Sequence, residues 1–247
     1  MLKDILLSLR MYGALEALET GIFSRIEGKE EYTLEILKAE FRYRERKQAA
    51  RRLKAAVFPS DKDWEEIDKK LNPEIDFDAV KALSNGDFID KKENLCLVGH
   101  QGTGKTHSLV ALGRELCQKG YSVKFCTAHD LVTSLEEAHD SSMLSKLISS
   151  LLKPSLLIID ELGFVPFTKK GAALLFDVFS KRYERGSIAV STNLVFEKWS
   201  VLFRSVEMTS ALLDRFTHNA HIFIYKGKSA RLHASSQRAA LHIKNQK

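Results

Sequence analysis

Apolar and polar positions follow two different periods along the chain, and the change between them divides it. Up to residue 58, apolar residues recur at helical spacing, as at Leu34 and Leu37, and no proline interrupts them. This spacing predicts an all-helical N-terminal domain over residues 1–58. Gly21 and Gly28 are expected to mark a turn between two helices.

Residues 59–93 have the composition of a connecting segment. They contain Pro73, the turn pair Asn85-Gly86 and an excess of acidic residues. Apolar residues such as Trp64 and Phe77 also occur in this segment and are suited to packing on a neighbouring domain. We therefore predict an ordered connector between two domains.

From Asn94 onward, short apolar runs alternate with helical patterns. The helical patterns include Lys105–Lys119, closed by Gly120, and Gly171–Arg185, closed by Gly186. The predicted strands are Leu95–Val98, Val123–Thr127, Leu156–Asp160, Ser187–Thr192 and His221–Tyr225. This alternation predicts an α/β domain over residues 94–247, with a mostly parallel five-stranded sheet and helices on both faces. Ligands of such sheets bind at the carboxyl ends of the strands.

Composition excludes several classes of protein. With 44% hydrophobic and 28% charged residues among 247, the chain has an ordinary globular composition. Its three cysteines form no C-x-x-C pair, which indicates neither a disulfide framework nor a thiolate zinc site. The N-terminus lacks the apolar core of a secretory signal, and no apolar stretch approaches the ~18 residues of a membrane span. We expect a cytoplasmic protein without a membrane partner.

The first predicted strand is followed by a phosphate-binding motif, G-x-x-x-x-G-K-[ST]. Its glycines let successive backbone N–H groups point at phosphate oxygens, and the following helix adds the positive end of its dipole. Lys105 is expected to reach the β- and γ-phosphates, and the Thr106 hydroxyl to ligate Mg²⁺. The predicted nucleotide-binding residues here are Gly99, His100, Gln101, Gly102, Thr103, Gly104, Lys105, Thr106 and His107.

Two adjacent acids, Asp160 and Glu161, end the most apolar predicted strand. Asp160 is placed to hold Mg²⁺, and Glu161 to polarise an attacking water. A second acid beside the γ-phosphate suits hydrolysis, whereas a kinase must exclude water. No Asn-Lys-x-Asp motif for reading guanine is present, so the pattern favours ATP as the nucleotide.

Three further polar residues are candidates for the same site. Asn193 reaches the γ-phosphate or the attacking water if its strand lies beside the Asp160 strand, and is otherwise part of a helix cap. Arg215 and Arg231 are candidates for stabilising transition-state charge, and each is otherwise a solvated surface arginine.

The motifs found so far are spread over nearly the whole chain and occur together in one known family. They are Leu9-Arg10-Met11, the basic run Arg42–Arg52, Gly99–Thr106, Asp160-Glu161-Leu162-Gly163-Phe164, Lys181–Ser187, Ser191–Asn193 and Leu213–Phe216. In this combination the chain resembles the IstB-like ATPases. These are AAA+ helper proteins of insertion-sequence transposases and are related to the DnaC-type helicase loaders.

The resemblance implies a P-loop NTPase fold of the AAA+ type, with an extra helix within Asp130–Lys153. It also implies ATP-dependent self-assembly on duplex DNA, with nucleotide at the subunit interfaces, and stimulation of a cognate transposase. By position, Lys105 and Thr106 match the Walker A residues, and Asp160 and Glu161 the Walker B pair.

The resemblance also assigns roles to the three remaining candidates. Asn193 matches the sensor I position, Arg215 the arginine finger that acts on a neighbouring subunit, and Arg231 the sensor II position. The chain departs from the family at Ala230, where an aromatic residue is usual.

Basic residues gather at two places outside the predicted ATP site. One is the helical run up to Lys54, where they cover more than one helix face and suit phosphate contacts on duplex DNA. The alternative is a helix that docks on an acidic neighbour such as residues 61–78. The tail from Lys226 onward is basic as well and is either a further DNA contact or a frayed end. The candidate DNA-binding residues are Arg42, Arg44, Arg46, Lys47, Arg51, Arg52 and Lys54.

The sequence therefore predicts a DNA-stimulated ATPase that uses ATP and Mg²⁺ and regulates a transposase. Two alternatives stay open. One is a DnaC-like helicase loader, in which the N-terminal helices hold a replicative helicase. The other is a small-metabolite kinase, against which the acid pair Asp160-Glu161 and the basic helix argue.

Overall fold

The structure is a computed structural model that describes residues 2–21, 28–233 and 235–236. The chain forms two compact units that divide between Arg52 and Leu53. Each unit is described by itself.

The first unit is helical, and a buried carboxylate joins its helices. Its elements are α1 (Leu2–Ser8), α2 (Tyr12–Glu19) and most of α3 (Lys29–Ala56). The first turn of α2 has no side-chain cap of its own, and Glu40 of α3 supplies one by accepting hydrogen bonds from the N–H groups of Gly13 (2.7 Å) and Ala14 (3.2 Å). Arg44 donates to the same carboxylate at 2.6 Å. The turn predicted from Gly21 to Gly28 lies mostly outside the described residues.

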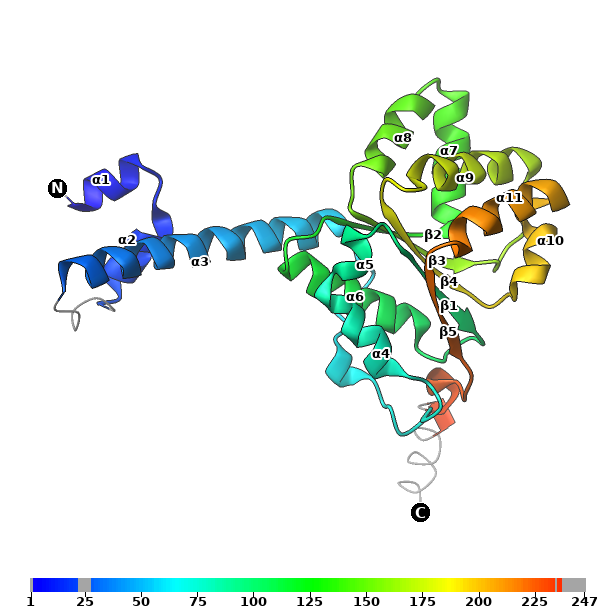
Figure 1. Ribbon diagram of the computed structural model, residues 1–247, viewed down its shortest axis with the longest axis horizontal. Coiled ribbons are helices and arrows are strands. Elements are labelled where there is room, and N and C mark those ends of the chain that lie inside the picture. Colours follow the sequence, from blue (N-terminus) through cyan, green and yellow to red (C-terminus); the bar gives the residue numbers. More distant parts are fainter. Residues whose placement is uncertain (1, 22–27, 234, 237–247) are drawn as a thin grey trace, which may run out of the picture. The chain divides into compact units, whose positions relative to one another are not determined.

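The second unit contains a sheet of five parallel strands in the order β2-β3-β4-β1-β5 (Figure 1). The strands are β1 (Asn94–Gly99), β2 (Val123–Thr127), β3 (Leu156–Leu162), β4 (Ser187–Thr192) and β5 (Ala220–Tyr225). Each predicted strand is present at its predicted place, so the α/β prediction is confirmed. The order brings β3 and β4 side by side and puts β1 next to β4, although these two are distant in sequence.

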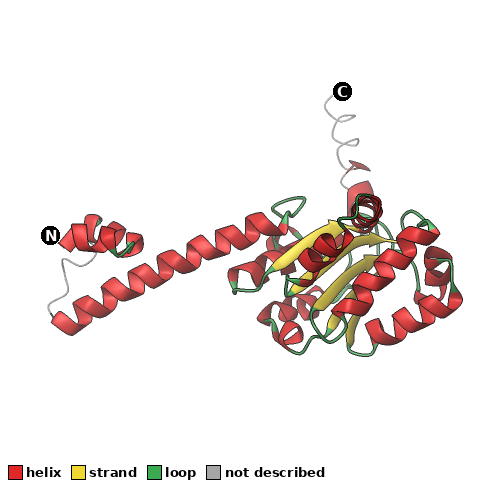
Figure 2. Ribbon diagram, turned by 90° about the horizontal axis from the view of Figure 1, so that it is seen from above, coloured by secondary structure: helices red, strands yellow, loops and turns green. Residues whose placement is uncertain are grey.

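Helices cover both faces of the sheet (Figures 1 and 2). The alternation along the strands sets the two layers, because Leu95 and Leu97 join one hydrophobic core while Cys96 and Val98 join the other. The core of Leu95 receives side chains from the last turn of α3 and from α4 (Phe77–Ala82), α5 (Asp87–Asp90) and α6 (Lys105–Gln118). Those on the opposite face are α7 (Ala128–Asp140), α8 (Leu144–Leu152), α9 (Lys169–Arg182), α10 (Trp199–Phe203) and α11 (Val206–Thr217). Short 3₁₀ turns are η2 (Trp64–Glu66), η3 (Leu83–Asn85) and η4 (Phe196–Lys198).

Residues 59–93 pack into the second unit. Trp64, Ile75 and Phe77 are buried in the same core as Leu95. The ring of Phe77 meets that of Tyr225 edge to face, with 5.6 Å between their centroids. This segment therefore forms part of the layer that covers the Leu95 face of the sheet.

Helix α9 ends earlier than its sequence predicts. Thr168 caps its first turn, and the last helical residue is Arg182, so the predicted end at Arg185 is wrong. Gly186 serves another purpose: a Cβ there would lie 2.6 Å from a guanidinium nitrogen of Arg182. The glycine leaves room for this buried arginine.

None of the helices in the described ranges combines the length and the apolar composition of a membrane-crossing segment.

Candidate ATP site

The phosphate-binding loop connects β1 to α6 and curls around its own lysine. Gly102 and Gly104 have φ angles of +77° and +103°, which residues other than glycine adopt only with backbone strain. The Nζ atom of Lys105 donates to the carbonyl oxygens of Gly99 and His100, both at 2.7 Å. The Thr103 hydroxyl donates to the His100 carbonyl at 2.8 Å. The loop thus has the rounded backbone that a phosphate group requires.

Lys105 is a buried cation, only 9% exposed. Burial lowers its pKa from the ordinary lysine value; the negative charges of Asp160 and Glu161 oppose this effect, and the positive charge of Arg231 adds to it. The ammonium group is held by carbonyl oxygens, which are weaker partners than phosphate oxygens. It is therefore available for a bound phosphate.

Asp160 and Thr106 form the part of the site suited to Mg²⁺. The Thr106 hydroxyl donates to Oδ1 of Asp160 at 3.1 Å, and the carboxylate is buried near the end of β3. A hydroxyl and a carboxylate are the hard oxygen ligands that Mg²⁺ prefers, so these residues fit the ion.

Glu161 is turned out of its strand by a β-bulge. The pairing of β3 with β4 shifts between Ile159 and Leu162, and Glu161 has a φ of +60°. This left-handed conformation is uncommon for a residue with a side chain and here accompanies the bulge. Bulges redirect side chains, and here the carboxylate of Glu161 is exposed and lines the cavity at the loop.

Ser191 of β4 is a site residue to which the sequence analysis assigned no role. Its hydroxyl donates to Oδ1 of Asp160 and accepts the backbone N–H of Glu161 at 3.0 Å. Ser191 is itself buried. The available signal was a polar residue that directly follows the apolar run Ile188–Val190 and precedes Asn193.

One cavity of about 770 Å³ brings most of the predicted residues together. Strand β4 lies beside β3, which is the arrangement that Asn193 needs in order to reach a γ-phosphate. The predicted residues that line the cavity are Gln101, Gly102, Gly104, Lys105, Thr106, His107, Glu161, Asn193 and Arg231.

The connecting segment also reaches this cavity. Ser60, Lys62 and Glu66 contribute to its wall. His107 donates from Nε2 to the backbone carbonyl of Asp63 at 2.6 Å, because a carbonyl oxygen can only accept. Residues that precede the sheet in sequence therefore form part of the wall of the ATP cavity.

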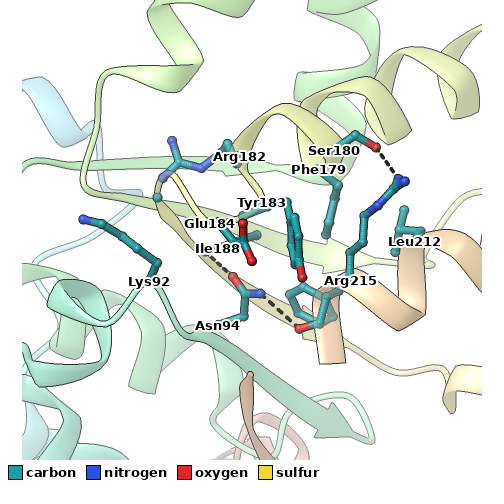
Figure 3. Close-up of a pocket in the computed structure, with 12 residues that line it drawn as sticks. Lys92, Asn94, Phe179, Ser180, Arg182, Tyr183, Glu184, Ile188, Leu212 and Arg215 are labelled. Atoms are coloured by element: carbon teal, nitrogen blue, oxygen red, sulfur yellow. Dashed lines mark hydrogen bonds between the residues drawn. The ribbon is translucent and has the colours of Figure 1, made fainter. Parts of the chain in front are cut away.

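Arg215 lies in a different place. It lines a small cavity together with Asn94 and Ile188, which lie at the amino ends of β1 and β4 (Figure 3). The phosphate loop follows the opposite, carboxyl end of β1. Its guanidinium donates to the Ser180 hydroxyl at 3.2 Å and lies 5.8 Å from the centre of the Phe176 ring. Arg215 does not line the 770 Å³ cavity of its own chain.

Asn94 fixes the end of the helix that carries Arg215. Its Oδ1 accepts the backbone N–H of Ile188 at 2.9 Å, and its Nδ2 donates to the Phe216 carbonyl at 3.0 Å (Figure 3). The orientation of α11 is thereby tied to the first residues of two central strands.

Several of the candidate DNA-binding residues have partners within the first unit. Arg44 pairs with Glu40, Arg46 approaches Glu16 at 4.0 Å, and Lys47 lies over an aromatic ring. All of these basic side chains remain exposed, as do those of Arg42, Arg51 and Lys54, whereas Arg52 is half-buried. The surface of α3 is therefore basic but partly neutralised. In the C-terminal tail, Arg238, Lys244 and Lys247 lie outside the described residues.

Comparison with known proteins adds a family to this geometry. Residues 3–238 match the family model described as IstB-like ATP binding protein. The chain is 34% identical over 202 residues to the ATP-binding protein of insertion sequence IS5376 of Geobacillus stearothermophilus, which covers 82% of this chain and 80% of the relative. It is 32% identical over 215 residues to the corresponding protein of IS21 of Pseudomonas aeruginosa, covering 87% and 81%. Among solved structures, DnaA of Aquifex aeolicus with bound AMPPCP aligns at a TM-score of 0.57 and 19% identity, over 69% of this chain and 51% of DnaA, and shows the same fold.

Proposed function

The chain belongs to the family of IstB-like ATP binding proteins, and on this premise we propose that it is a DNA-stimulated ATPase that assembles on duplex DNA and activates the transposase of its insertion sequence. The curated relatives are insertion-sequence proteins, which favours this role over that of a helicase loader.

The observation that supports hydrolysis is the bulge that turns Glu161 into the cavity that Lys105 also lines. In the proposed reaction, Lys105 and the loop N–H groups bind the phosphates, and Glu161 accepts a proton from the attacking water. Asn193 positions that water. Mg²⁺ held by Thr106 and Asp160 would neutralise charge on the phosphates.

The position of Arg215 supports catalysis between subunits. A side chain near the amino ends of the strands is far from the phosphate site of its own chain but is available on the outer surface to another copy. We therefore assign Arg215 to the ATP site of a neighbouring subunit, where an arginine that stabilises transition-state charge is worth about 10³–10⁵ in rate.

The exposed basic residues of α3 are proposed to contact DNA phosphates. Because such contacts carry no sequence information, the predicted binding is strongly salt-dependent and weakly specific.

The test of the ATPase proposal is Glu161→Gln. We expect ATP still to bind and assemblies on DNA to persist in electron micrographs, while turnover falls by about 10²–10⁴, the usual contribution of a general base. Glu137→Gln, at an exposed position on α7, is the matched control. Unchanged hydrolysis in Glu161→Gln would remove this residue from the mechanism.

The DNA proposal is tested separately by measuring the dissociation constant for duplex DNA against salt concentration. The double variant Arg46→Ala with Arg51→Ala is expected to lower the logarithmic salt slope by about 0.9 for each DNA phosphate that the protein no longer neutralises. Lys3→Ala on α1 is the control. A slope equal to that of the wild type would exclude these residues from the DNA surface.

The partner is tested by pull-down of this protein with the transposase and, in parallel, with a replicative helicase. Capture of the transposase alone supports the transposition role, and capture of the helicase alone supports the loader role.

A further inference from the structure

The side chain of Asn72 is paired with the backbone of Lys228, far away in the sequence. Nδ2 of Asn72 donates to the Lys228 carbonyl at 3.0 Å, and the Lys228 N–H donates to Oδ1 of Asn72 at 2.6 Å. Asn72 is 4% exposed. Both ends of one amide are therefore used to hold one residue of the C-terminal segment.

Gly227, which precedes Lys228, leaves room for this contact. A Cβ at Gly227 would lie 2.1 Å from Oδ1 of Asn72, closer than any side chain allows. The absence of a side chain at position 227 lets the backbone approach the amide.

Two residues further on, the same segment touches the phosphate loop. The Ala230 N–H donates to the Gly102 carbonyl at 2.9 Å. The Ser229 side chain packs so closely on Gly102 that a Cβ there would lie 2.1 Å from the Ser229 hydroxyl oxygen. Arg231 follows directly, lines the ATP cavity, and its charge acts on Lys105.

Hydrogen bonds rather than apolar burial hold this segment in place. None of the residues from 226 to 233 is buried, and Ala230 contributes only a methyl group. The position of Arg231 therefore depends on the few polar contacts that fasten the backbone beside it.

We propose that Asn72 is a positioning residue that holds residues 226–233 on the phosphate loop and so places Arg231 at the nucleotide. This inference rests on the proposed function, because it requires ATP in this cavity. It gives a residue of the connecting segment a direct effect on nucleotide binding.

The contact itself can be tested without nucleotide. Trypsin cleaves after Lys228, and the bond it cuts lies next to the two hydrogen bonds of Asn72. Proteolysis of a transiently opened segment follows the population of the open form. In the full-length protein we expect Asn72→Ala to be cut at this bond about 5–30 times faster than wild type, the ratio that corresponds to 1–2 kcal/mol.

The control is Asn85→Ala, in the same connecting segment. Asn85 is exposed, and its amide forms hydrogen bonds with Asp87 in its own turn. It should leave cleavage after Lys228 unchanged. Equal cleavage of Asn72→Ala and wild type would show that Asn72 does not hold the segment.

The consequence for the nucleotide is tested by the affinity for a fluorescent ATP analogue and by steady-state hydrolysis. Asn72→Ala should weaken binding by about 5–30-fold. Gly227→Ala, which lies on the exposed side of the contact, should do the same and guards against misfolding of the first variant. In an Arg231→Ala background, neither change should weaken binding further, because the residue that they position is gone.

The outcomes separate this inference from the proposed function. A wild-type protein that binds no ATP would refute the proposed function, and the cleavage result would still report on the contact. A wild type that binds ATP, together with wild-type affinity in both Asn72→Ala and Gly227→Ala, would overturn the inference alone. Full additivity with Arg231→Ala would also overturn it, since Asn72 would then act by another route.

Discussion

The hydroxyl group of Ser191 joins the carboxylate of Asp160 to the backbone of Glu161, although Ser191 lies on the neighbouring strand. A hydroxyl has a single proton to donate, and this one goes to Asp160, so the N–H of Glu161 is accepted by a lone pair. One buried group thus orients the proposed magnesium ligand and stabilises the bulge that turns out the proposed catalytic base.

Ser191→Ala should therefore separate binding from turnover. The N–H of Glu161 loses its acceptor, and Asp160 loses one of two hydroxyl donors while keeping that of Thr106. The backbone of the phosphate loop is untouched. We expect kcat to fall by about 10–100-fold, as is usual when a supporting partner of a metal ligand is removed, with ATP affinity within a factor of two or so of wild type. Steady-state hydrolysis and binding of an ATP analogue measure the two effects.

The control for this variant is Ser149→Ala on α8, where the exposed hydroxyl donates to a carbonyl of its own helix. A kcat equal to that of wild type in Ser191→Ala would mean that the bulge at Glu161 is held by the strand pairing alone.

The sheet and the phosphate loop could be predicted because their signals are local. The apolar runs of the five strands and the spacing from Gly99 to Thr106 are each read within a few neighbouring residues. Strand order is not local. The sequence therefore brings Asn193 to the end of the Asp160 strand only on the condition that the two strands are neighbours, and the sheet meets this condition.

The contacts that orient these residues could not be predicted in the same way. The pairing of Asn72 with Lys228 depends on where separate segments meet in the fold. The same is true of the burial of Arg182 against Leu151 and Pro154, which places its guanidinium beside Gly186. A glycine after a helical pattern usually marks the end of the helix. At Gly186 the absence of a side chain instead leaves space for the buried Arg182, and the helix has already ended at that arginine. The polar residue Ser191 gave a signal, but its partners are fixed only once β3 lies beside β4.

Arg182, in the segment Lys181–Ser187, is expected to stabilise the fold. It is almost fully buried and donates to four carbonyl oxygens, at distances of 2.7 to 3.3 Å. These oxygens belong to Leu151, Pro154, Ser155 and Ser187. The guanidinium therefore ties the end of α8 to the beginnings of β3 and β4.

Arg182→Met keeps an unbranched apolar side chain but removes every guanidinium donor. Of the four carbonyl oxygens, that of Ser155 still accepts the Ser187 N–H at 3.1 Å. We expect the free energy of unfolding to fall by about 3 kcal/mol, because each unsatisfied buried group costs about 1–3 kcal/mol. Urea unfolding followed by circular dichroism measures the change. The neighbouring Arg185→Met, at an exposed position, should change the stability by about 0.5 kcal/mol at most. Equal stability of the two variants would contradict a structural role for Arg182.

Arg215→Ala should be rescued by a second defective protein. If Arg215 acts on the ATP site of a neighbour, an assembly of Arg215→Ala and Lys105→Ala subunits contains some interfaces with both an intact Arg215 and an intact Lys105. Each variant alone is expected to hydrolyse ATP at a small fraction of the wild-type rate, and the mixture to recover part of it. Mixing Arg215→Ala with the double variant Lys105→Ala and Arg215→Ala is the control, because no interface is then complete. A mixture no more active than its components would exclude action between subunits.

The lowered pKa of Lys105 gives ATP binding a distinctive alkaline limit. Burial disfavours the ammonium form, so the group loses its proton at a lower pH than an ordinary lysine, whose pKa is 10.5. Phosphate binding needs the charged form, and affinity should therefore begin to fall at a pH where exposed lysines are still charged. Arg231 lowers the same pKa, so Arg231→Ala should move the titration of Lys105 in the nucleotide-free protein to higher pH. Competitive acetylation across a pH series, read by mass spectrometry at Lys105 with the exposed Lys3 as internal reference, measures both shifts. A titration of Lys105 at or above the ordinary lysine value, or a downward shift in Arg231→Ala, would contradict the electrostatic balance described for this site.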